Sequence, residues 1–174
     1  MFRVSCLISK TMLKKSIKNK QGFTLIELLV VIGIIAVLAT IVLVAVNPAR
    51  QFAQARDTER SSDLNALLNA IGQRLADNKG LFRVTTDTVC TAAMDIPTTE
   101  KNIADAVSDS SGVNIAPCIV PTYLSSMPVD PKTGVYTSDT VYNTQYHIIK
   151  DTIGRITLTA VDTEFATPDI SLTR

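Results

Sequence analysis

An apolar run from Phe23 to Val46 constrains this chain more than any other feature. Glu27 is the only charged residue in it. An α-helix rises about 1.5 Å per residue, so this run would be roughly 36 Å long, enough to cross the hydrocarbon core of a bilayer. We therefore predict a membrane-spanning helix over residues 23–46.

The charges around this run predict its orientation. Six basic residues and no acidic ones precede Gly22, and the rest of the chain has 11 basic and 16 acidic side chains. Basic clusters beside an apolar helix stay cytoplasmic, so we expect a single-pass protein with its N-terminus inside and its body outside. The net charge of −5 in the body does not indicate nucleic-acid binding. The six basic residues are Arg3, Lys10, Lys14, Lys15, Lys18 and Lys20.

Two ordinary explanations of the run are a secretory signal and a plain membrane anchor. A secretory signal has an apolar region of about 7 to 15 residues, and this run is longer. A plain anchor fits the length but explains neither the polar pair Gln21-Gly22 nor the acid at Glu27.

The peptide from Lys20 to Val30, KQGFTLIELLV, resembles the processing site of type IV pilins and of type II secretion pseudopilins. The resemblance implies that a prepilin peptidase removes a basic leader, residues 1–22, by cutting after Gly22. It also implies N-methylation of the new terminus at Phe23 and retention of the apolar run. A leader beginning at Met12 would carry the same site.

The position of Glu27 needs an explanation. A charge within a membrane span costs about 2.5 to 3.5 kcal/mol, and the helix dipole offsets only about 0.3 to 1 kcal/mol. A natural partner is the new amino group of Phe23 on a neighbouring subunit, the role that the resemblance also implies. Glu27 would then set the register between subunits; alternatively, it lies among lipid headgroups without a partner.

Residues 47–80 are predicted to form an amphipathic helix. Pro48 should kink or loosen it near the membrane, although the helix need not stop there, and residues 78–80 carry a stop signal. The apolar face that should pack on the body comprises Leu64, Leu67, Leu68, Ile71 and Leu75. Charged residues are expected to form a solvated face, or in part to bridge subunits: Arg50, Arg56, Asp57, Glu59, Arg60 and Asp63.

Residues 81–134 are rich in Thr, Ser, Asp and Pro and predict a long connecting region, with a short helix over residues 100–107. A disulfide between Cys90 and Cys118 would pin this region if it lies outside the cytoplasm. Closing that loop would stabilise the body by roughly 3 to 4 kcal/mol.

Residues 135–174 are predicted to form an antiparallel β-sheet. Alternation over residues 142–150 and 155–162, with a turn at 151–154, favours a hairpin, and a third strand is expected near residues 135–137. The inward residues would be Tyr142, Tyr146, Ile148, Ile156, Leu158 and Ala160. The predicted fold is α+β: a long N-terminal helix, half transmembrane and half amphipathic, packed on a small sheet, as the resemblance to pilins implies.

The peptide from Val120 to Pro131 also looks like pilin and pseudopilin sequences that precede the sheet. Major pseudopilins hold calcium nearby, and Asp130 with Asp139 could supply oxygens. No segment has the ligand density of a dedicated calcium loop, so a plain turn is the preferred interpretation, with no cofactor expected.

Candidates for catalysis are missing from the sequence. His147 is the single histidine, predicted on the polar face of a strand, and no phosphate loop or metal-spaced cluster is present. We therefore expect no enzymatic activity. Three hypotheses remain: a pilus subunit, a pseudopilin of a secretion or DNA-uptake machine, and a membrane-anchored binding domain that does not polymerise.

Overall fold

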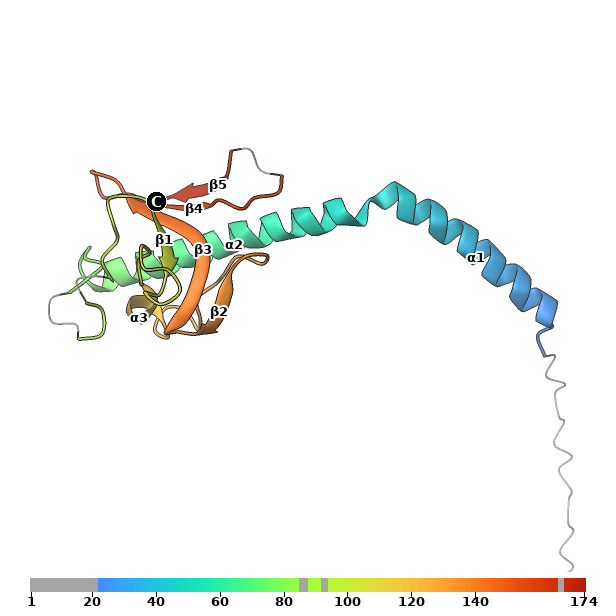
Figure 1. The fold of residues 1–174 in the computed structure, drawn as a ribbon, viewed down its shortest axis with the longest axis horizontal. Coiled ribbons are helices and arrows are strands. Elements are labelled where there is room, and N and C mark those ends of the chain that lie inside the picture. Colours follow the sequence, from blue (N-terminus) through green and yellow to red (C-terminus); the bar gives the residue numbers. More distant parts are fainter. Residues whose placement is uncertain (1–21, 85–87, 92–93, 166–167) are drawn as a thin grey trace, which may run out of the picture. The chain divides into compact units, whose positions relative to one another are not determined.

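The computed structural model describes residues 22–84, 88–91, 94–165 and 168–174. The chain divides into two compact units, Met1–Ala45 and Val46–Arg174. Helix α1, Leu25–Val46, belongs to the first unit except for its last residue, and the second unit contains helix α2, Pro48–Asp77, with a β-sheet (Figure 1).

Helix α1 is apolar on all sides. Over Leu25–Ala45 its mean hydropathy is 3.2, and it is long and apolar enough to cross a membrane. A chain in lipid must satisfy its backbone groups internally, and an unbroken helix does so. The prediction of a helix suited to a membrane is confirmed in length and composition.

Helix α2 has well-defined ends. Asn47 caps its start, with its side chain accepting a hydrogen bond from the Arg50 amide, and Pro48 occupies the first turn, where no amide partner is needed. Asn47 itself has a left-handed backbone, with φ of 43°, so the structure has two helices where one continuous helix was an option. At the other end the amide of Gly80, with φ of 88°, donates to the Leu75 carbonyl at 2.7 Å, which confirms the predicted stop.

The sheet has five strands, and every pairing is antiparallel. The strands are β1, Lys101–Ala104; β2, Val135–Ser138; β3, Val141–Lys150; β4, Ile156–Ala160; and β5, Ile170–Thr173. Their order is β1-β3-β4-β5, and β2 pairs with β3. The predicted hairpin is confirmed, because Lys150 of β3 pairs with Ile156 of β4 across the turn.

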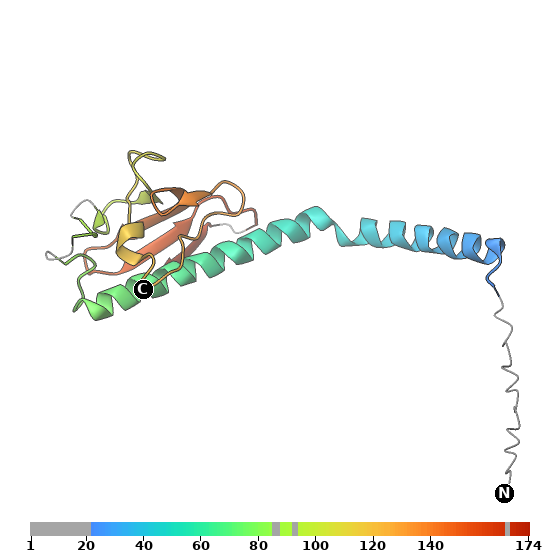
Figure 2. The ribbon, with the colours of Figure 1, turned by 90° about the horizontal axis from the view of Figure 1, so that it is seen from below.

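The core of the second unit lies between α2 and one face of the sheet. The predicted inward residues of β3 and β4 are all buried, and so are Leu64, Leu67, Leu68 and Ile71 of α2. Figure 2 shows α2 running along the sheet. The residues predicted to face inward on α2 and on the sheet thus share one core, which confirms the predicted α+β packing. Burying each such side chain contributes about 1.5 to 3 kcal/mol.

One predicted element is wrong. Residues 100–107 do not form a helix; they contain β1, which pairs with β3, with Asn102 opposite His147. Local sequence did not predict this strand because its pairing partners lie 39 to 47 residues away. A short helix α3, Ala116–Ile119, and the last strand β5 were also not predicted.

Candidate functional site

The predicted cleavage site lies just outside helix α1. Gly22, Phe23 and Thr24 precede the first helical residue, Leu25, and all three are exposed. A Cβ atom added at Gly22 would meet no atom within 4 Å. A side chain at this position would therefore meet no described part of the chain, so a requirement for glycine would come from another molecule.

A capping box begins helix α1. The amide and the hydroxyl of Thr24 each donate to Oε2 of Glu27, both at 2.8 Å, and the Glu27 amide donates back to the Thr24 hydroxyl at 3.3 Å. Thr24 is the N-cap and Glu27 the third helical residue, the spacing that lets the two satisfy each other's amides. This local partner of Glu27 was not predicted, although the pattern Thr-x-x-Glu before an apolar run is the usual signature of a capping box.

The two oxygens of Glu27 differ in their contacts. Both bonds from Thr24 end on Oε2, and Oε1 accepts no hydrogen bond from any residue that the structure describes. One oxygen thus begins the helix and the other is free to accept a donor from outside the chain.

The surface of α1 is large and apolar. Leu28 is 57% exposed and Ile32 63% exposed, and the helix contributes nothing to the buried core. A core helix of a soluble domain would bury at least one face, so α1 needs lipid or other protein to cover it.

The N-terminal part of the chain, with the predicted cleavage site and most of α1, matches a known family model. Residues 17–43 match the family model of the prokaryotic N-terminal methylation motif. The chain carries the prepilin signature of type IV pilins and pseudopilins. The prepilin motif covers Gly22, Phe23, Glu27 and most of α1, so it confirms the resemblance found in the sequence. No curated protein and no solved structure matches the chain.

Outside the prepilin motif, the charged residues of α2 do not all face solvent, although a solvated face was predicted. Arg60 is fully buried, and its Nε and Nη2 bond both oxygens of Asp130, at 2.5 and 3.2 Å. Its Nη1 bonds Asp57 at 2.8 Å. A buried guanidinium is tolerated only when such partners satisfy its donors, so Arg60 fastens α2 to the loop that precedes β2.

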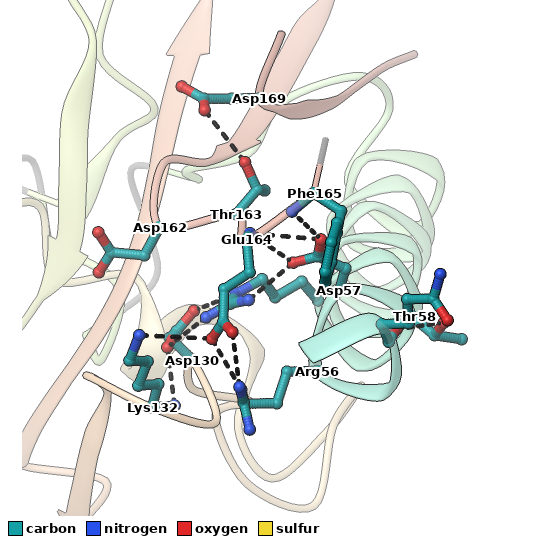
Figure 3. A network of polar contacts seen from close by, with 12 residues as sticks. Arg56, Asp57, Thr58, Asp130, Lys132, Asp162, Thr163, Glu164, Phe165 and Asp169 are labelled. Carbon is teal, nitrogen blue, oxygen red and sulfur yellow. Dashed lines mark hydrogen bonds and ion pairs between the residues drawn. The ribbon is translucent and has the colours of Figure 1, made fainter. Parts of the chain in front are cut away.

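A second set of contacts fastens the segment after β4 to α2 (Figure 3). Asp57 accepts hydrogen bonds from the amides of Glu164 and Phe165, and Arg56 forms a two-pronged pair with the Glu164 carboxylate. Lys132 lies 3.5 Å from the same carboxylate. The network therefore joins α2, the loop before β2 and the segment before β5.

The ionisation of these groups follows from their contacts. Burial opposes the charge on Asp130, but the bonds from Arg60 and from the amides of Thr133 and Lys132 outweigh it and lower the pKa of Asp130 below 3.8. Burial likewise raises the pKa of Asp63, which accepts a hydrogen bond from the Tyr146 hydroxyl at 2.8 Å. The network thus depends on Asp130 being ionised.

The two residues considered for calcium have other partners. Asp130 is occupied by Arg60 and by loop donors, and Asp139 accepts a hydrogen bond from the Tyr136 hydroxyl at 2.6 Å. Among the described residues no group of three or more His, Cys, Asp or Glu side chains could hold a metal ion. At Asp130 a calcium ion would have to displace Arg60.

The predicted disulfide is confirmed. Cys90 and Cys118 are joined, with an S–S distance of 2.01 Å. Arg74 of α2 supports the same region, because its guanidinium donates to the carbonyls of Phe82 and Cys118 at 2.6 and 2.7 Å. The role of this buried arginine was not predicted.

The single histidine lies on β3, as predicted. Its Nδ1 is 3.3 Å from a carboxylate oxygen of Glu100, and its side chain is 30% exposed. This pair sits beside a polar depression of about 550 Å³ on the sheet, lined also by Asn102, Asp109 and Asn143.

Proposed function

We propose that this chain is a non-catalytic structural subunit of a type IV pilus or a pilus-like filament. A prepilin peptidase cuts it after Gly22, Phe23 is N-methylated, and copies assemble through α1. Before assembly the chain crosses the cytoplasmic membrane once, with its body outside; afterwards it belongs to a filament in the cell envelope or outside the cell. The observation that carries the proposal is the prepilin motif at the start of a helix exposed on all sides.

The exposed surface of α1 supports two successive roles. In the membrane, lipid covers its apolar side chains; in a filament, the same side chains pack against other copies. A soluble monomer would leave this surface in water, which is unfavourable at about 25 cal/mol for each Å².

The free oxygen of Glu27 supports a role in register. Cleavage after Gly22 creates a positive amino group at Phe23, and a charge that enters an apolar bundle needs a partner. In the proposed filament Oε1 of Glu27 pairs with the Phe23 amino group of a neighbouring copy, while Oε2 keeps its bonds to Thr24.

Substitutions at Glu27 separate charge pairing from helix capping. Glu27→Gln keeps a side chain that can complete the capping box but removes the charge. We expect Glu27→Gln and Glu27→Ala to lose filament assembly alike, and Thr24→Ala, which keeps the charge, to assemble. Assembly is measured by sedimentation of sheared filaments. Normal assembly of Glu27→Gln would contradict the charge-pairing role.

Substitution at Gly22 tests processing. Because a side chain at Gly22 meets nothing in the precursor, Gly22→Val should insert in the membrane normally and remain uncut. Gly33→Ala is the matched control, since a Cβ there also meets no atom within 4 Å and the change lies away from the cleavage site. Normal cleavage of Gly22→Val would remove the assigned site.

A pseudopilin of a secretion or DNA-uptake machine shares every step above, and the two roles differ in whether long surface filaments form. A membrane-anchored binding domain that does not polymerise is distinguished by crosslinking, because its α1 helices would not be joined to one another. The partners proposed are other pilin subunits, the prepilin peptidase and the membrane assembly machinery.

A further inference from the structure

A pocket of about 460 Å³ lies at the C-terminal end of α2. The loop that follows α2 and the turn between β3 and β4 form its walls. Its floor is apolar and comprises Leu75, Phe82, Ile96 and Ile156. Leu81 on its rim is 58% exposed, and Ile153 in the adjoining turn is 75% exposed. Apolar surface of this kind, rimmed by polar groups, typically contacts another molecule.

Among the described residues around this pocket, one cation has no ion-pair partner. Lys150 lies 3.9 Å from Asp95, and Asp151 is bonded to Arg155 at 2.8 Å. Arg83, which also lines the pocket and is half-buried, has no partner among the residues that the structure describes. The lining holds two cations and two acids, and Arg83 is the charge left for an acidic group of an occupant that also covers the apolar floor.

The hairpin of β2 and β3 combines those two properties. Val135, Tyr136 and Val141 are 55%, 40% and 38% exposed, although hydrophobic residues of a strand pair usually face a core. Asp139 is the single charged residue of the segment 135–141. Val135 and Val141 lie on one face of this hairpin and Tyr136 on the other, because Tyr136 pairs with the inward-facing Tyr142. The hairpin thus carries an exposed pair of valines and one acid.

The pocket and the hairpin lie at opposite ends of β3. Val141 begins β3 in the hairpin, and Lys150 ends it at the rim of the pocket. Ten residues of strand span about 30 Å, so one copy cannot place its hairpin in its own pocket. Two different surfaces that fit each other on separate copies make a head-to-tail contact, the type that produces open filaments.

We propose that the hairpin of one copy docks on the pocket of a second copy, with Asp139 facing Arg83 and the side chains of Val135 and Val141 covering Leu81. This contact rests on the proposed function, because a filament must hold many copies in a fixed offset. It adds a second contact between copies, separate from α1, that selects the same kind of subunit.

Charge reversal tests the pairing in the full-length protein. Arg83→Glu and Asp139→Arg should each lower the amount of sedimented filament about tenfold, because like charges then meet across the contact. The double variant should recover most of the loss. The matched controls are Lys101→Glu, an exposed cation on β1, and Asp169→Arg, whose carboxylate accepts one hydroxyl hydrogen bond as Asp139 does. Both controls should assemble normally.

Folding is checked in each variant by the Cys90–Cys118 disulfide, which changes mobility on a non-reducing gel. With the disulfide intact, normal assembly of both single variants would overturn the proposal. It would also be overturned if the double variant gave no more sedimented filament than the weaker of the two single variants. Rescue by the double variant could not come from an ion pair within one copy, because Asp139 lies next to the start of β3 and Arg83 lines the pocket at its other end.

Crosslinking supplies geometry that does not depend on charge. The double variant Leu81→Cys, Asp139→Cys should form a ladder of disulfide-linked copies on oxidation, and Leu81→Cys, Lys101→Cys should not. If Leu81→Cys, Asp139→Cys forms no ladder, the docking contact is wrong. The proposed function would still hold if Glu27→Gln abolishes assembly. If the wild-type chain forms no filament, the proposed function itself fails.

Discussion

Helices α1 and α2 are neighbours in the chain but meet opposite requirements. Helix α1 exposes apolar side chains on every side and has no core of its own, whereas α2 buries one face of leucines against the sheet. The stability of α2 is therefore internal to the body, and α1 depends on whatever surrounds it. Substitutions in α2 should act on folding, and substitutions in α1 on insertion and assembly.

The largest expected effect is at Arg60. Arg60→Ala leaves the buried Asp130 carboxylate without its partner, which should lower the free energy of unfolding of the body by about 3 to 5 kcal/mol. Urea unfolding of the protein in detergent, followed by circular dichroism, measures this. Arg56→Ala is the control, since its pair with Glu164 is partly exposed and should contribute only about 0 to 1 kcal/mol. Equal losses in the two variants would contradict the buried role of Arg60.

Leucines in the two helices should behave differently. Leu67→Ala opens a cavity in the core and should destabilise the body by about 2 to 5 kcal/mol. Leu28→Ala on α1 should leave the unfolding of the body unchanged, because Leu28 is outside that core. The same urea experiment compares them. A large effect of Leu28→Ala on the body would break the distinction between the helices.

Acid should weaken the body by a smaller amount. Because the pKa of Asp130 in the folded state lies below the ordinary 3.8, its contribution is complete above about pH 3.8 and is lost as the pH falls through the folded value. Unfolding followed between pH 6 and pH 2 should show this loss. In the double variant Arg60→Met, Asp130→Leu the contribution of this pair should be absent, and an unchanged acid profile would contradict its source.

The smallest effect is expected at the start of α1. Thr24→Ala removes the N-cap and should loosen the first turn by about 0.5 to 2 kcal/mol without changing the stability of the body. Amide exchange in detergent micelles detects the opening of that turn. Exchange rates like those of the unmodified chain would mean that the capping box does not hold the helix start.

Local patterns were enough to predict much of this molecule. The apolar run, the leucine spacing of α2 and the alternation in β3 and β4 each repeat over several residues, so they predicted elements that the structure confirms. The disulfide was also predicted, because both cysteines lie in a body expected outside the cytoplasm.

Contacts between distant residues could not be predicted in the same way. Arg60 and Asp130 lie 70 positions apart, and a charged residue on a helix normally faces water, so nothing local distinguishes Arg60 from Glu59. Strand β1 is defined by its partner β3, which explains why its local sequence predicted a helix instead. The capping box at Thr24 and Glu27 is different, because its spacing was visible in the sequence and could have been found.

Mass spectrometry of the N-terminal peptide, from protein isolated in polymeric form from cells, tests the central claim most directly. The account predicts a mature chain that begins with N-methylated Phe23, recovered in a polymer crosslinked through α1. A native chain that keeps residues 1–22 and stays monomeric in the membrane would contradict it.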